Sequence, residues 1–92
     1  MEEDFNKRFF EAIDALVNQG QISSLSGFII SIGRHPSKYR NLRQVCYYRD
    51  KVKRHYSRIE FCVIYELVKQ FHISLNWLYF GTGKMFAPIS AK

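Results

Sequence analysis

Hydrophobic residues recur at helical spacing along most of this chain, and the first such stretch covers residues 4–19. Its apolar side chains stand three or four positions apart and form one stripe: Phe5, Phe9, Ile13, Leu16 and Val17. Glu2, Glu3 and Asp4 stand at the start, where the positive end of a helix dipole favours acids. Gly20 is a natural end for this predicted first helix.

A short second helix and a tight turn are predicted next. Ser24 is a good N-cap for a helix that extends to Ile32. The apolar positions of this helix are Leu25, Phe28, Ile29 and Ile32. Gly33 then ends it, because a sharp turn after a helix needs a positive φ that glycine adopts without strain. The fixed φ of Pro36 suits the first turn of a third helix, so residues 33–35 are a tight turn between two helices.

The third helix is expected to begin near Pro36 and to end somewhere between Val45 and Arg49. Its inward positions are Tyr39, Leu42, Val45 and Cys46. Residues 49–56 have no clear period and are mostly charged, which predicts an exposed loop.

Two more helices complete the pattern. Ser57 and Glu60 have the spacing of a capping box that opens a fourth helix. Its buried stripe is Ile59, Val63, Ile64, Leu67, Val68 and Phe71. Ser74 can cap a short last helix over residues 75–80, which Gly81 and Gly83 end. We therefore predict an all-α fold of five helices in a single domain, 1–92, with its core in residues 5–86 and a frayed tail at 87–92.

Composition narrows the setting of this domain. The two cysteines, Cys46 and Cys62, are too few for a disulfide framework and are interpreted as small buried hydrophobes. Trp77 is expected in the core. The N-terminus is acidic rather than a signal peptide, and the longest uncharged run, residues 20–33, is too short to span a bilayer. A cytoplasmic, reduced setting with no membrane association is the default expectation.

Charge is distributed very unevenly along the chain. Residues 34–58 hold nine Lys or Arg against the single acid Asp50, a net of +8, whereas residues 1–33 carry a net of −3. Residues 59–92 carry +1, and the whole chain carries +6. A phosphate backbone is the commonest biological surface that rewards such a cluster, through the release of counterions.

The predicted third helix combines this charge with groups that can read bases. With Tyr39 and Leu42 inward, an outward stripe is formed by Ser37, Asn41, Gln44 and Tyr48. Ser, Asn and Gln can read base edges in a major groove, and Asn and Gln suit adenine. Lys38, Arg40 and Arg43 flank the stripe and would meet phosphates.

At these residues the chain resembles a lambda-repressor-like (XRE-type) helix-turn-helix DNA-binding domain. Two blocks carry the resemblance, which spans roughly residues 5–86. Residues 24–42, SLSGFIISIGRHPSKYRNL, fit the helix-turn-helix of that family. Residues 72–86, HISLNWLYFGTGKMF, are similar to the N-x-x-W-L-x-x-G-x-G-x-M ending of many bacterial and phage regulators of this kind.

The resemblance implies a repressor-like transcriptional regulator that binds duplex DNA sequence-specifically as a homodimer. By position, Ser37, Asn41 and Gln44 match sites that face bases. The expected phosphate contacts are Ser24, Lys38, Arg40, Arg43, Tyr48, Lys51, Lys53 and Arg54. The candidate dimer surfaces are the edge of the first helix at Phe10 and the end of the chain at residues 80–86.

Two residues depart from the family's pattern. Leu25 stands where relatives often hold a Gln that touches the DNA backbone, so that side-chain contact is lost. Ile29 stands where relatives usually have Ala, at the closest crossing of the two helices. A branched side chain there should push the helices apart or be accommodated by Gly27.

Other chemistry has no support in the sequence. The His and Cys residues show no zinc-site spacing, and no catalytic triad, carboxylate pair or phosphate-cradling loop stands out, so we expect no enzyme activity, metal, cofactor or small-molecule ligand. Two other functions stay open. The fold could serve as a protein–protein adaptor that docks on an acidic partner, or as a nonspecific or RNA binder that uses its basic, tyrosine-bearing loop.

Overall fold

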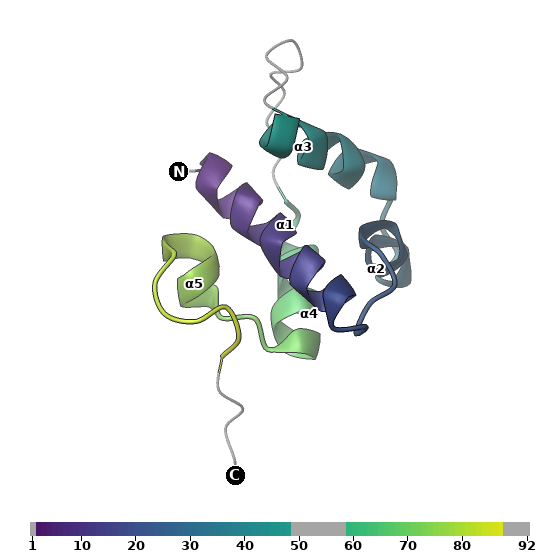
Figure 1. The fold of residues 1–92 in the computed structure, drawn as a ribbon. Helices are drawn as coiled ribbons and strands as arrows, with labels where there is room; N and C mark the ends of the chain where they lie inside the picture. The colour runs from purple at the N-terminus through teal and green to yellow at the C-terminus, as the bar shows by residue number, and fades with distance from the viewer. Residues whose placement is uncertain (1, 49–58, 88–92) are drawn as a thin grey trace.

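A computed structural model describes residues 2–48 and 59–87, with side chains from 4 to 44 and from 59 to 87. Within these ranges the fold is all-α, as predicted (Figure 1). The helices are α1 (Glu2–Asn18), α2 (Leu25–Ser31), α3 (Pro36–Tyr48), α4 (Phe61–Phe71) and α5 (Leu75–Phe80). Extended pairing among the described residues is limited to an isolated antiparallel bridge between Ile73 and Phe86.

Helix α1 crosses the middle of the molecule and contacts α2, α3 and α5 (Figure 1). Because neighbours cover it on several sides, it buries more than the predicted stripe. Phe10 is fully buried beside Phe9, with the two rings edge to face at 5.1 Å. Phe10 therefore cannot form the dimer surface suggested from the sequence. Val17, expected inside, lies at the end of the helix and is 36% exposed.

The α2–α3 unit forms as its capping residues predict. Ser24 is the N-cap of α2, and its Oγ accepts a hydrogen bond from the Gly27 N–H at 2.9 Å. Gly33 adopts a φ of +79° directly after α2, and a Cβ there would meet no atom within 4 Å. Its role is therefore the backbone conformation rather than close packing. Pro36 opens α3 as expected.

Ile29 is fully buried in the common core. Gly27 does not provide its space, because a Cβ on Gly27 would lie 2.7 Å from Ser23 Oγ and 3.2 Å from Ser24 Oγ. The glycine thus makes room for the two serine hydroxyls at the start of α2.

The predicted capping box at the start of α4 is wrong. The helix begins at Phe61 with Glu60 as its N-cap, and no side-chain hydrogen bond caps it. Ser57, the other expected member, lies outside the described residues. Glu60 does not reach back along its own helix because its carboxylate accepts a hydrogen bond from Tyr39 on α3. The apolar stripe is confirmed, with Ile59, Val63, Ile64 and Leu67 buried and Val68 and Phe71 partly buried.

Helix α5 has the predicted bounds and cap, since Ser74 Oγ accepts a hydrogen bond from the Trp77 N–H at 3.3 Å. At its other end, Arg8 donates from Nε to the Leu78 carbonyl at 2.8 Å and from a terminal nitrogen to the Tyr79 carbonyl at 2.9 Å. A guanidinium from α1 thus satisfies carbonyls that the end of a helix leaves open. Trp77 was expected in the core, but it is only partly buried, and Leu78 is the fully buried residue of α5.

The segment after α5 returns to the body of the protein. The Ser74 N–H donates to the Met85 carbonyl at 2.8 Å, and the Ala87 N–H donates to the His72 carbonyl at 2.7 Å. The predicted fraying is therefore wrong at Ala87, and residues 88–92 lie outside the described part of the chain. Within the described residues, no helix is both long enough and apolar enough to cross a membrane.

Candidate nucleic-acid interface

The outer face of α3 carries the three residues predicted to meet bases. Ser37, Asn41 and Gln44 are exposed, whereas Tyr39 and Leu42 on the opposite side are buried. The spacing of four and then three residues places the three polar side chains in one row along the helix. The structure therefore confirms that these side chains share an exposed face. The side chain of Tyr48, the fourth member of the predicted stripe, lies outside the described residues.

Two of the three basic residues of α3 that are predicted to bind phosphate already form ion pairs with acidic residues of the protein. Arg43 lies 2.6 Å from Asp14 Oδ1 on α1, and Lys38 Nζ lies 3.9 Å from Glu60 Oε1. Arg40 has a different kind of partner, since it donates a hydrogen bond of 3.4 Å to the hydroxyl of Ser37 on the same helix. The two acids were not expected at this site, because nothing in their sequence spacing relates them to α3.

A shallow groove of about 680 Å³ lies where α1, α2 and α3 meet. Its lining consists of Asp14, Ser24, Leu25, Ser26, Arg40, Arg43 and Gln44. The groove thus joins the start of α2, predicted to contact the DNA backbone, to the exposed polar row of α3. The Ser24 hydroxyl oxygen is used as a helix cap, but its side chain stays at the exposed edge. Leu25 is 6% exposed and contributes to the core.

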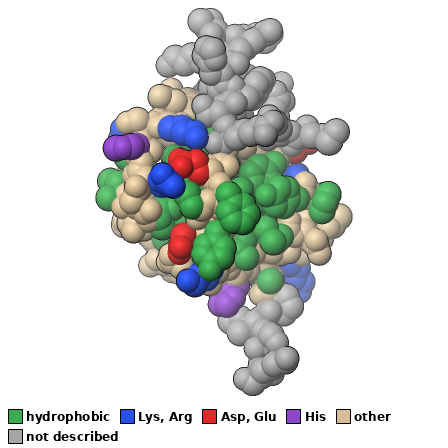
Figure 2. Space-filling model, turned by 180° about the vertical axis from the view of Figure 1, so that it is seen from behind, with side chains coloured by type: hydrophobic (Ala, Val, Ile, Leu, Met, Phe, Trp, Pro, Cys, Tyr) green, Lys and Arg blue, Asp and Glu red, His purple; other side chains and the backbone are tan. Residues whose placement is uncertain are grey.

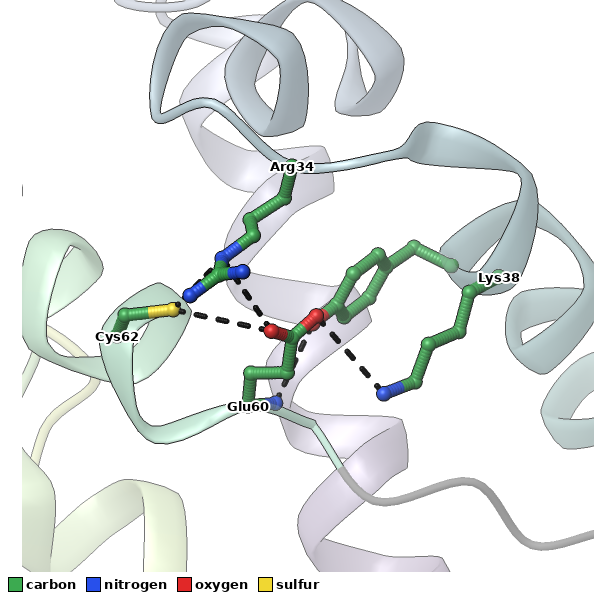
Figure 3. A network of polar contacts seen from close by, with 5 residues as sticks. Arg34, Lys38, Glu60 and Cys62 are labelled. Atoms are coloured by element: carbon green, nitrogen blue, oxygen red, sulfur yellow. Dashed lines mark hydrogen bonds and ion pairs between the residues drawn. The ribbon is translucent and has the colours of Figure 1, made fainter.

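Glu60 is the centre of a second polar cluster, which joins the α2–α3 turn to α3 and α4 (Figure 3). Its Oε1 accepts a hydrogen bond from the Tyr39 hydroxyl at 3.0 Å, and the Glu60 N–H donates to the same hydroxyl at 3.2 Å. Its Oε2 lies 3.3 Å from Arg34 Nε. Arg34 Nε also donates to Cys62 Sγ at 3.2 Å. We call Arg34, Lys38, Tyr39, Glu60 and Cys62 the Glu60 cluster.

The surroundings of the cluster shift two pKa values. Burial, followed by the nearby Glu60 carboxylate, raises the pKa of Tyr39 from 10.0 to about 12, although the hydrogen bond from the Glu60 backbone acts in the opposite direction. The hydrogen bond to the Cys62 sulfur and the negative charge of the Glu60 carboxylate raise the pKa of Arg34. Tyr39 therefore stays protonated and Arg34 stays charged throughout the physiological range.

The expectation that Cys62 is buried in the core is wrong. It is only partly buried, because it lies in the first turn of α4 beside Arg34 and Glu60 rather than inside the core. It is a free thiol. The side chain of Cys46 lies outside the described residues, as do the expected phosphate contacts Lys51, Lys53 and Arg54.

In the described part of the chain, no three or more His, Cys, Asp or Glu side chains gather in a way that could hold a metal ion. His35 is exposed in the turn before α3. Comparison of the chain with protein-family models, with curated proteins and with solved structures gave no match.

Proposed function

We propose that this protein is a sequence-specific DNA-binding protein that places α3 in the major groove of duplex DNA. The observation that carries the proposal is the division of α3: Ser37, Asn41 and Gln44 are exposed along one face, and Tyr39 and Leu42 are buried behind them. A helix anchored in this way presents hydrogen-bonding side chains at a fixed register, which direct readout requires.

The helix order supports a lambda-repressor-like fold as part of the proposal. The short helix α2, the Gly33 turn and α3 stand in the order of a helix-turn-helix, with α1 packed against both helices. In this arrangement α2 crosses the DNA backbone while the first turns of α3 enter the groove. Arg40 and the start of α2 at Ser24 would then face phosphates from the groove between α2 and α3.

We propose further that the protein acts as a transcriptional regulator and binds its operator as a homodimer. Because Phe10 is buried, the segment at residues 80–86 remains as the candidate for the dimer surface. Phe80 is 75% exposed there, and hydrophobic side chains gather on the face of the molecule shown in Figure 2. Large exposed apolar side chains on α4 and α5 are Phe61, Tyr65, Leu75, Tyr79 and Phe80.

The deciding experiment is selection of duplex oligonucleotides from a random pool by the purified protein. We expect one enriched motif, and substitutions at Asn41 should relax the preference at one base position within it. A pool that stays random after several rounds, although the protein retains duplex DNA, would rule out sequence-specific reading. Sedimentation of wild type and Phe80→Ala, each with the enriched duplex, tests the dimer.

A protein–protein adaptor is the second candidate. The ion pairs that the basic side chains of α3 already form within the protein favour it. Lys38 and Arg43 already face carboxylates, and exposed aromatic side chains remain on α4 and α5. Filter binding to random duplex at low salt separates the two functions, because an adaptor would retain no DNA. Competition with single-stranded RNA in the same assay tests the RNA-binding alternative.

A further inference from the structure

The Glu60 carboxylate contacts two kinds of partner, a buried hydroxyl and two cations (Figure 3). Oε1 accepts the hydrogen bond from the buried Tyr39 hydroxyl and lies 3.9 Å from Lys38 Nζ. Oε2 lies 3.3 Å from Arg34 Nε. One acid at the start of α4 therefore faces cations from both the turn and the first turn of α3.

The structural contact of Glu60 does not need a negative charge. Tyr39 is fully buried, and its hydroxyl needs an oxygen that accepts its hydrogen bond. An amide oxygen accepts such a hydrogen bond as a carboxylate oxygen does. The backbone N–H of Glu60, which donates to the same hydroxyl, is independent of the side chain.

The electrostatic contacts of Glu60 do need the charge, and they lie at the surface. The side chains of Arg34 and Lys38 are 48% and 37% exposed, and that of Glu60 is 32% exposed. Ion pairs this accessible contribute little to stability. Both cations flank the beginning of α3, where the backbone of a bound duplex would pass.

We propose that Glu60 limits the affinity of the α3 surface for DNA by holding Arg34 and Lys38 away from the phosphates. The inference rests on the proposed function and adds to it a residue that sets binding strength. Each phosphate that a protein cation neutralises contributes about −0.9 to the slope of log K against log salt. While Glu60 is charged, Arg34 and Lys38 contribute less than this, and the carboxylate itself repels the duplex.

The test is Glu60→Gln, measured by filter binding to a mixed-sequence duplex over a salt series. We expect tighter binding, by roughly tenfold at low salt, and a slope steeper by about one to two units. The melting temperature should change little, because the amide keeps the bond to Tyr39. Glu66→Gln is the matched control: it removes one acid from α4, where the Glu66 carboxylate accepts a hydrogen bond from the Gln70 side chain. Equal gains in the two variants would mean that net charge alone is responsible, and would overturn the inference.

A second measurement does not depend on the folding of Glu60→Gln. In the otherwise wild-type protein, Lys38→Ala should leave the salt slope nearly unchanged, whereas Arg40→Ala should reduce its magnitude by about 0.9. If Lys38→Ala reduces the slope as much as Arg40→Ala does, Lys38 already contacts phosphate and Glu60 does not withhold it.

Failure of the inference can be told from failure of the proposed function. Retention of duplex by wild type with an identical slope in Glu60→Gln would overturn the role of Glu60 and leave DNA binding standing. Absence of retention for wild type and every variant, with all of them folded, would overturn both.

Discussion

Helices α3 and α4 are of similar length, yet they differ in how many apolar side chains they contribute to the core. Within its described side chains α3 buries Tyr39 and Leu42, while Ser37, Asn41 and Gln44 face outward. Helix α4 buries Val63, Ile64 and Leu67 and places Val68 and Phe71 against the same cluster. The hydrophobic effect therefore anchors α4 through three buried side chains, whereas the described side chains of α3 are mainly polar and include two buried ones, Tyr39 and Leu42.

Polar contacts compensate in part for the smaller apolar anchoring of α3. Tyr39 on α3 is joined to Glu60, and Arg43 on α3 is paired with Asp14 on α1. These contacts hold α3 in place without covering its outer face. A helix that must present side chains to a partner gains from such attachment, because every additional apolar anchor would remove a position from the exposed surface.

The largest expected effect lies on α4. Leu67→Ala removes a fully buried side chain from the core and should cost about 2–5 kcal/mol of unfolding free energy. Urea denaturation measures the loss, and Gln70→Ala, at an exposed position of the same helix, is the control. The salt slope of DNA binding at a temperature where the variant is folded should match wild type. A loss below about 1 kcal/mol would show that α4 is not the anchor.

On α3, Tyr39→Phe tests the polar attachment. The substitution keeps the ring in the core but leaves the Glu60 N–H without its hydroxyl partner, at a cost of about 1–3 kcal/mol. The measurement is again urea denaturation, near neutral pH. A variant as stable as wild type would mean that the ring alone holds α3.

The difference in stability between the wild type and Tyr39→Phe is expected to depend on pH. Because the pKa of Tyr39 is raised from 10.0 to about 12 on folding, the folded protein keeps a proton that the unfolded chain loses near pH 10. The stability that Tyr39 contributes is complete below about pH 10 and is lost as the pH rises toward 12. The difference between wild type and Tyr39→Phe should thus narrow when unfolding is measured above pH 10 rather than at pH 8.

Asn41→Ala tests the exposed face of α3 by itself. On the preferred duplex it should cost about 1–3 kcal/mol of binding free energy, with no change in unfolding free energy, because the side chain makes no contribution to the core. Titration of the enriched duplex against a duplex altered at one base pair provides the measurement. Equal losses on both duplexes would remove Asn41 from the residues that read sequence.

Asp14→Asn is expected to change stability only slightly. The Asp14 and Arg43 side chains are 40% and 36% exposed, so their pair should contribute no more than about 1 kcal/mol. The substitution removes the negative charge that faces Arg43, and the salt slope should steepen by at most about one unit. An unchanged slope would assign Arg43 to the attachment of α3 rather than to DNA.

The helices themselves could be predicted because their signals are local. Ser24 and Ser74 cap α2 and α5, Gly33 and Gly81 adopt positive φ at the helix ends, and apolar spacing located each stripe. Such features depend on residues within one or two turns, so the order of the residues is enough to reveal them. The outward placement of Ser37, Asn41 and Gln44 followed for the same reason, since it is the complement of the buried positions.

The partners of charged side chains depended on tertiary structure. Glu60 has a spacing typical of a capping box, but folding brings Tyr39 within hydrogen-bonding distance, and the carboxylate binds there. Asp14 and Arg43 are far apart in the chain and meet only because α1 packs on α3. Phe10 and Ala87 are similar cases, covered or paired by segments that no local pattern identifies. By itself, the sequence determined which segments are helical and where most of their apolar positions lie, because those properties depend on near neighbours. Tertiary structure alone decided which charges face solvent and which face each other, because contacts between distant segments form only when the core closes.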